Sequence, residues 1–396
     1  MNPPFSRRTQ WDLTSTGYAL AYQSLRSGGE AFFDLTASNP TACGFHYDRA
    51  GILDALHQPA SLEYQPDPQG LAVARAAVAE YYAVAASAQL PIEQIFLVTS
   101  TSEAYSYLFR LHCDPGAEVL IAQPSYPLFQ FLADLEDVRL VPYPLFYDHG
   151  WHIDLAALAA RITSRTRAIV VVHPNNPTGH FTSLPDRQAI ELLCHQHGLA
   201  LIVDEVFLDY ALLAANAATP PPTSFAAAEH PVLTYVLSGL SKIAGLPQIK
   251  AAWIAALGPA PLLREATARL EVVADTFLSM NAPVQHAMPY LLQNRAGIQQ
   301  QILHRVRENL AALDHALFNA PAVSRLQVQG GWYAVLRIPA LVSGEALAIR
   351  LIEQQRVAVH PGYFYGFDGD GWLVLSLLPP TAEFAEGIRR IIQHFS

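Results

Sequence analysis

Short apolar runs alternate with amphipathic stretches through the middle of the chain. Several runs, such as those at 168–173 and 200–204, are almost continuously apolar, which is typical of parallel strands covered by helices on both faces. The pattern predicts strands at 95–99, 118–123, 139–141, 168–173, 200–204, 233–237 and 250–254. It predicts helices at 102–111, 126–135, 153–161 and 185–197. We therefore expect an α/β fold whose large, mostly parallel seven-stranded sheet is covered by helices.

The pattern changes after about residue 281. Helical periodicity over roughly 284–319 is followed by strand patterns at 331–338 and 372–378 with a helix near 344–355 between them, and a helix at 382–395 closes the chain. This predicts a second, smaller α+β domain. We expect a large domain at 45–283 and a small domain formed by 1–44 together with 284–396.

Charge and cysteine content narrow the class of protein. The formal net charge is −10, so the chain lacks the cationic surface that binds nucleic-acid phosphates. The sequence shows neither an Arg-rich helix nor a long apolar span, so it does not predict membrane binding. Three scattered cysteines without a C-x-x-C pair, and an N-terminus without an apolar leader, are typical of a cytoplasmic protein. The histidines at 195 and 197 do not share a helix face, and we expect no metal site.

The two lysines of the chain stand out. Lys242 and Lys250 are the only lysines among 24 basic residues, and they lie eight positions apart. A compositional drift from lysine towards arginine explains why lysine is scarce in this chain, but it does not explain why the two lysines lie in one short segment. Because arginine cannot replace lysine where an amine must lose its proton and attack a carbonyl group, the pair indicates chemistry in this segment.

Polar residues follow several of the predicted strands. Strand 95–99 is followed by Ser100, Thr101 and Ser102 at the start of a helix, where hydroxyl groups and the helix dipole suit a phosphate. Ordinary helix capping explains the same residues and is the more common reason for them. Because ligands bind at the carboxyl ends of strands in open α/β sheets, these positions are nonetheless candidates for a binding site.

Three further strand ends carry polar motifs. Strand 168–173 leads into N-N-P-T-G, which by itself is a common turn signal. Strand 200–204 ends in Asp204, which by itself is more often a helix cap than a catalytic group. Strand 233–237 leads into S-G-L-S-K-I-A-G-L-P, the segment that begins at Ser238 and contains Lys242. Each signal is modest, but their order along the chain is specific.

This order resembles the class I/II aminotransferases of the fold-type I pyridoxal-phosphate family. The resemblance extends over essentially the whole chain, and the N-P-T-G and S-K-x-x-G-L-P motifs carry most of it. It implies pyridoxal 5'-phosphate as the cofactor, held as a Schiff base on Lys242. It also implies that Asp204 pairs with the pyridinium nitrogen, that Asn176 bonds the phenolic oxygen and that Tyr126 stacks on the ring.

The resemblance also implies how the cofactor's phosphate is held. The residues that it assigns to this role or to the surrounding cofactor site are Ser100, Thr101, Ser102, Ser238, Ser241 and Lys250. Tyr64 would reach the phosphate in a neighbouring copy of the chain, which implies a homodimer with shared active sites. An amino-acid substrate follows from the same resemblance.

The chain departs from the family pattern at three positions. Lys250 stands where a phosphate-binding arginine is usual, and it supplies charge without the planar fork. Phe207 stands where a tyrosine often bonds the phenolic oxygen, and whether Tyr210 substitutes is open. Val374 stands where most members have the arginine that binds the substrate carboxylate, and Arg337 is either a substitute for that arginine or a surface residue. His360 and the aromatic run 363–365 either line the pocket or pack a loop.

Two functions therefore stay open at the level of sequence. The leading hypothesis is an aminotransferase that acts on an amino acid and a 2-oxo acid through Lys242. The alternative is a non-transaminating enzyme on the same cofactor, such as a decarboxylase, lyase or synthase, which Val374 favours because the held Cα bond decides the reaction. A transcription regulator on this fold would need an attached DNA-binding domain, for which we find no sequence signal.

Overall fold

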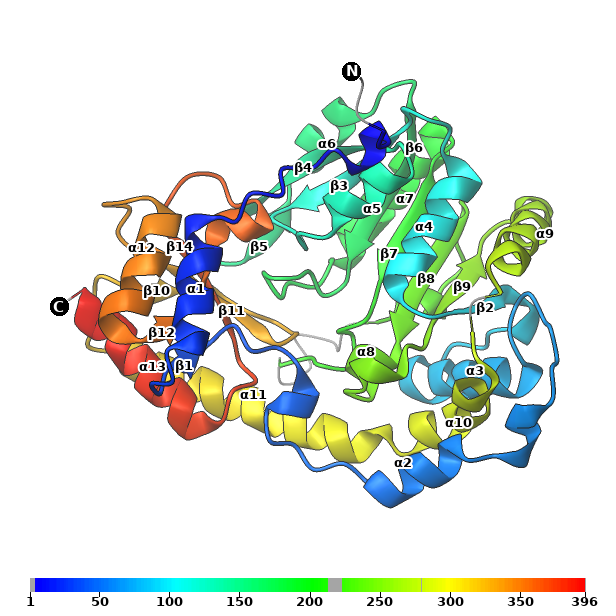
Figure 1. Cartoon of the computed structure of the whole chain (residues 1–396). Coiled ribbons are helices and arrows are strands. Elements are labelled where there is room, and N and C mark those ends of the chain that lie inside the picture. Colours follow the sequence, from blue (N-terminus) through cyan, green and yellow to red (C-terminus); the bar gives the residue numbers. More distant parts are fainter. Residues whose placement is uncertain (1–3, 213–222, 279, 396) are drawn as a thin grey trace.

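The computed structural model describes residues 4–212, 223–278 and 280–395. It contains an eight-stranded sheet in the order β2-β9-β8-β7-β6-β3-β4-β5 (Figure 1). Strands β8, β7, β6, β3 and β4 run parallel, whereas β9 is antiparallel to both β2 and β8. The strands are β2 Ile95–Val98, β3 Glu118–Gln123, β4 Arg139–Tyr147, β5 Trp151–Ile153, β6 Thr166–Val172, β7 Ala200–Asp204, β8 Thr234–Gly239 and β9 Ala252–Leu257.

Helices cover both faces of this sheet, as the apolar runs predict. Alternate residues of one strand enter different cores: Leu201 and Val203 of β7 join one cluster, and Ile202 joins the other. The second cluster is closed by α4 and α9, and the first by helices that include α3 and α7. The helices around the sheet are α2 Arg49–Leu56, α3 Ala72–Ala86, α4 Thr101–His112, α5 Phe129–Leu135, α6 Leu155–Arg161, α7 Leu184–His197, α8 Leu240–Ile243 and α9 Ala260–Phe277.

The predicted α/β fold is confirmed, with two local differences. The sheet has an eighth strand, β5, which pairs antiparallel with an extended β4. Pro142 and Pro144 make the end of β4 look like a loop in the sequence, because proline weakens a strand assignment. The helix expected at 126–135 begins at Phe129, since Pro127 disfavours helical backbone at Tyr126.

The C-terminal region forms a second layer around a four-stranded antiparallel sheet, β10-β11-β14-β13. The helices expected over roughly 284–319 are α10 and α11, which are separated at Asn294. The elements of this region and of the N-terminal segment are α1 Gly17–Ser27, β1 Phe33–Asp34, α10 Ala282–Gln293, α11 Arg295–Leu317, β10 Ser324–Arg325, β11 Tyr333–Arg337, α12 Gly344–Arg350, β12 Val357–Ala358, β13 His360–Pro361, β14 Trp372–Ser376 and α13 Thr381–His394.

The N-terminal segment joins this second layer. Strand β1 pairs in parallel with β12, and Tyr18 of α1 packs edge-on against Phe364 with ring centroids 5.3 Å apart. These contacts support the division into a domain at 45–283 and a domain formed by 1–44 with 284–396, which we keep as a proposal. Within the described part of the chain, no helix is long and apolar enough to cross a bilayer.

We expect a buried amide on α11 to stabilise the second layer. The Nδ2 of Asn309 donates to the carbonyls of Leu377 and Pro379, at 3.0 and 2.8 Å, and thereby fixes the chain after β14. Asn309→Ala leaves both buried carbonyls unpaired and should lower the free energy of unfolding by about 1–3 kcal/mol. Chemical denaturation measures this loss.

The matched control for this prediction lies on the exposed side of the same helix. Arg307→Ala should change the free energy of unfolding by less than about 0.5 kcal/mol. Equal effects of the two substitutions would contradict the role given to the Asn309 bonds.

Candidate active site

A cavity of about 310 Å³ opens at the edge of the large sheet where the parallel strands end. This is the edge at which open α/β sheets bind ligands. The side chains around it come from the N-terminus of α4, the ends of β6 and β7, the α8 segment, the start of β9 and the small sheet. The predicted site residues that line it are Ser100, Thr101, Ser102, Tyr126, Asn176, Asp204, Ser241, Lys242 and Lys250.

Lys242 lies on the short helix α8, immediately after β8. Its Nζ is 5.1 Å from the centre of the Trp332 ring and 5.5 Å from that of Phe207, and within the described residues it has no hydrogen bond or salt bridge. Burial lowers the pKa of this amine to about 8, although the charge of Asp204 opposes the shift. Near pH 8 about half of the amine is therefore neutral and nucleophilic.

Asp204 ends β7 and is almost completely buried. Its Oδ1 accepts from the backbone N–H of Val206 and its Oδ2 from the hydroxyl of Tyr105, both at 3.1 Å. Burial raises the pKa of Asp204 to about 6, and the two hydrogen bonds and the charge of Lys242 limit the rise. The carboxylate is thus held ionised at neutral pH in a fixed orientation.

Tyr105 is a site residue that the sequence analysis missed. It lines the cavity and lies one helical turn after Thr101 on α4. Residues four apart share a helix face, so a polar aromatic residue at this spacing from the hydroxyl-rich helix start was the available signal.

The N-terminus of α4 combines capping with exposure to the cavity. The Oγ of Ser100 accepts from the N–H of Glu103 at 3.1 Å, and the carboxylate of Glu103 accepts from the N–H of Thr99 at 2.6 Å. Ser100 is therefore the N-cap of α4, so the capping explanation holds for Ser100. Thr101 and Ser102 in the first turn also line the cavity, where hydroxyl groups and the helix dipole favour an anion.

Lys250 and Asn176 complete the polar lining. Lys250 lies between the short turn after α8 and β9, with a φ of 58°. Asn176 is buried, and its Oδ1 has no hydrogen-bond partner within the described residues. An unpaired buried amide costs free energy unless a ligand or water bonds it.

Two predicted residues lie outside this cavity. Tyr64 is 80% exposed and lines a separate surface hollow with Asp275 and Asn281. Ser238 is buried at the end of β8 and does not line the cavity, although its Oγ also lacks a partner within the described residues.

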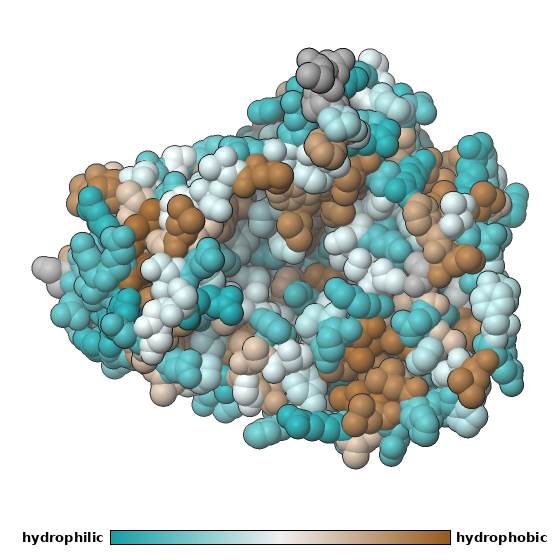
Figure 2. Space-filling model, viewed as in Figure 1, coloured by the Kyte–Doolittle hydropathy of each residue, from teal (hydrophilic) through white to brown (hydrophobic). Residues whose placement is uncertain are grey.

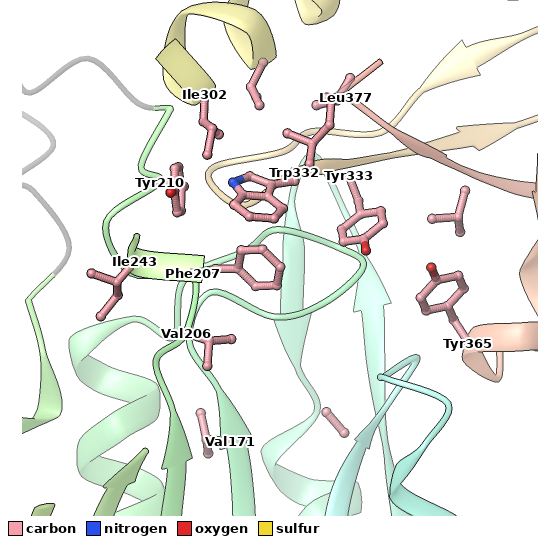
Figure 3. Close-up of a cluster of buried hydrophobic side chains, with 14 of the residues drawn as sticks. Val171, Val206, Phe207, Tyr210, Ile243, Ile302, Trp332, Tyr333, Tyr365 and Leu377 are labelled. Atoms are coloured by element: carbon pink, nitrogen blue, oxygen red, sulfur yellow. The ribbon is translucent and has the colours of Figure 1, made fainter. Parts of the chain in front are cut away.

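Tyr210 does not take the place of a tyrosine at Phe207. Its hydroxyl donates to the backbone carbonyl of Lys242 at 2.7 Å, and its ring packs on Trp332 with centroids 5.0 Å apart. Figure 3 shows Tyr210, Trp332 and Phe207 packed together, with Ile243 of α8 beside them. The side chain therefore holds the backbone of the lysine segment and is not part of the cavity lining.

Arg337 lies outside the cavity as well. Its Nη1 donates to the carbonyls of Asp370 and Gly371, at 2.7 and 3.2 Å, and its guanidinium stacks on the Trp372 ring at 4.2 Å. It does not line the cavity, so the structure gives no support to Arg337 as a substitute for the carboxylate-binding arginine. Val374 itself is fully buried in the middle of β14.

Known proteins resemble this chain along most of its length. The chain is 28% identical to alanine aminotransferase of Mycobacterium tuberculosis over 374 residues, which are 93% of this chain and 86% of that protein. It is 27% identical to glutamate-pyruvate aminotransferase AlaA of Escherichia coli K12 over 378 residues, covering 94% and 92% of the two chains.

Solved structures share the fold. Alanine aminotransferase from Pyrococcus furiosus superposes with a TM-score of 0.85 at 22% identity and covers 96% of this chain and 99% of its own. The model of the family described as aminotransferase class I and II matches residues 49–391. The chain therefore belongs to the class I and II aminotransferase family.

Proposed function

We propose that this chain is a pyridoxal-phosphate-dependent aminotransferase that moves an amino group between an amino acid and a 2-oxo acid, with Lys242 as its central catalytic residue. Family membership supports the reaction class. The observation that carries the proposal is the partly neutral amine of Lys242 in the same cavity as the buried carboxylate of Asp204.

The residues around the cavity fit pyridoxal phosphate. The amide of Asn176, whose Oδ1 has no partner among the described residues, offers a donor and an acceptor to a ring hydroxyl group. Ser100, Thr101, Ser102 and Ser241 offer hydroxyl groups to a phosphate, and Lys250 offers a positive charge. Tyr126, which also lines the cavity, would supply an aromatic face for the ring.

Lys242 and Asp204 would divide the proton chemistry. When bound, the cofactor withdraws electrons from the carbon that carries the reacting nitrogen. Lys242 would bond to the cofactor's aldehyde carbon and, once displaced by substrate, move a proton between the substrate Cα and that carbon. Asp204 would keep a proton on the pyridine nitrogen, while Tyr105 and the N–H of Val206 hold the carboxylate in place.

We further propose that two copies of the chain form the working enzyme. The exposed Tyr64 lies outside the cavity of its own chain, which is what a residue donated to a partner's site requires. The nearby Leu53 and Leu62 are also exposed, and Figure 2 shows apolar surface in the region that Figure 1 labels α2 and α10.

All three cysteines are free thiols, in keeping with a cytoplasmic enzyme.

One observation favours a second candidate function. Val374 removes the usual carboxylate anchor, and a different substrate orientation would select a different bond at Cα. A lyase, decarboxylase or synthase on the same cofactor would release carbon dioxide or another fragment. An aminotransferase would leave the nitrogen on the cofactor and release an oxo compound.

Replacement of Lys242 tests the central assignment. Lys242→Ala should abolish the Schiff-base absorbance of the cofactor-loaded protein and lower kcat by at least about 10³-fold, because Lys250, the other lysine that lines the cavity, is assigned to the phosphate. Absorbance spectroscopy and product assay measure the two effects. Lys242→Arg, which keeps the charge but cannot form the bond, is the matched control and should behave like Lys242→Ala. A retained absorption band in either variant would refute the assignment.

Asp204 should reduce the stability of the cofactor-free protein. Its folded pKa of about 6 exceeds the ordinary value of 3.8, so the folded state binds this proton more tightly than the unfolded state. The free energy of unfolding therefore falls as the pH rises from about 4 to 6. Asp204→Asn removes this loss and should stabilise the cofactor-free protein by about 1–3 kcal/mol at pH 7.5, with a smaller gain near pH 4.

Denaturation at several pH values checks this sign. The exposed Asp148→Asn serves as the control and should stay within about 0.5 kcal/mol of the wild type at each pH. A less stable Asp204→Asn protein at pH 7.5 would contradict the expected penalty of burial.

Subunit mixing tests whether Tyr64 acts across a dimer. Tyr64→Ala and Lys242→Ala should each lose most activity, and an equimolar refolded mixture should recover about a quarter of the wild-type rate, because each hybrid dimer contains one intact site. Mixing Tyr64→Ala with Asp204→Asn should give the same recovery. If every mixture stays at the average of its components, Tyr64 does not act in the partner's site.

A further inference from the structure

The buried Val374 lies on the face of the small sheet that meets the cavity. In the antiparallel pairing, Val374 is opposite Val335 on β11 and opposite His360 on β13. Tyr333, two residues before Val335 on the same face, lines the cavity. This face therefore borders the end of the site that is opposite the strand ends of the large sheet.

Uncharged hydrogen-bonding groups lie beside Tyr333, just behind the residues that line the cavity itself. The hydroxyl of Tyr365 is 3.3 Å from Nδ1 of His360. The ring of Tyr365 is 6.3 Å from that of Tyr333, and in Figure 3 the hydroxyl ends of these two tyrosines face the same space. The hydroxyl of Tyr18, close enough to Tyr365 to interact electrostatically, is buried without a hydrogen-bond partner in the described part of the chain.

No cation among the described residues serves this end. The basic residues that line the cavity are Lys242 and Lys250, both of which belong to the cofactor end of the proposed site. Arg337 is bonded to the turn carbonyls. His360 is largely buried, and burial lowers its pKa to about 4, so it is neutral at physiological pH even though the charge of Asp34 raises the value.

We infer that the substrate enters this end with its α-carboxyl group in an uncharged form, as an α-amino amide or ester, and that Tyr365 and His360 bond that group in place of an arginine. The inference rests on the proposed aminotransferase function and changes its amino-group donor: the amino acid is replaced by its amide or ester, and the oxo product is the corresponding 2-oxo amide or ester. A free carboxylate would be buried here without a counter-charge, which is costly. An amide or ester oxygen needs one or two hydrogen bonds, and the hydroxyl and imidazole groups supply them.

Binding without turnover tests the inference most directly. 2-Methylalanine and its amide lack a Cα hydrogen, so neither can lose a Cα proton, and the absorbance change of the cofactor-loaded enzyme before any release of carbon dioxide reports their binding. The wild-type enzyme should bind the amide at least ~10-fold more tightly than the free acid. Equal or tighter binding of the free acid would overturn the inference.

A variant with an added charge distinguishes the effect of the pocket from the intrinsic difference between the two ligands. The amine of the amide is less basic and is more often neutral, which favours binding of the amide to any such enzyme. This difference is the same for every variant, so it cancels when two variants are compared. Val374→Arg should shift the preference towards the free acid by at least ~10-fold. Val374→Leu adds volume without charge and should retain the wild-type order. An unchanged order in a folded Val374→Arg protein would count against the inference.

Tyr365→Phe provides an independent variant that keeps the fold of the pocket. Loss of the hydroxyl should weaken binding of the amide by about 5–30-fold while leaving that of the free acid within about twofold. If both ligands weaken equally, Tyr365 has only a packing role and the proposed contact is wrong.

The outcome is distinguishable from failure of the proposed function. If the amide binds preferentially but L-alaninamide produces no pyridoxamine form of the cofactor, transamination fails and the substrate inference stands. If L-alanine binds more tightly than its amide and also produces that form, transamination stands and the substrate inference fails.

Discussion

The site depends on keeping an amine and a carboxylate out of water at one edge of the sheet. Burial acts on both groups in the direction of neutrality, lowering the pKa of Lys242 and raising that of Asp204. Two donated hydrogen bonds limit the rise in the pKa of Asp204. The fall in the pKa of Lys242 is opposed only by the charge of Asp204. The carboxylate thus stays charged while the amine becomes available as a nucleophile.

Both layers of the molecule contribute residues that surround Lys242 and Asp204 and bury them. Parallel strands deliver their carboxyl ends to a common edge, so residues far apart in sequence meet there. Trp332 arrives from the small sheet and presents its ring to the lysine. Gln299 of α11 donates to the carbonyl of Ile243 at 2.9 Å, next to the carbonyl that Tyr210 bonds. The backbone carbonyls of Lys242 and Ile243 are therefore hydrogen-bonded by side chains from both layers of the molecule.

Much of this arrangement was predictable from sequence because it follows periodicity and strand-end motifs. Nine of the predicted site residues line the cavity, since a motif at a strand end fixes both its element and its edge. Contacts that depend on how two elements pack were not predictable. The hydroxyl of Tyr105 reaches Asp204 only through the packing of α4 against the sheet, and Tyr210 turns towards the backbone of Lys242 because Trp332 fills the adjacent space.

Strand β11 has a consequence for how such an enzyme can diversify. Trp332, at its start, touches the lysine segment, and the next residue, Tyr333, lines the cavity. A substitution at the start of β11 can therefore disturb Lys242, whereas β13 and β14 belong to the same small sheet without contacting α8 through any described interaction. Substitutions on β14 and on the edge strand β13 can therefore alter this side of the site while the contacts of the lysine segment stay the same. Val374, in the middle of β14, is such a position.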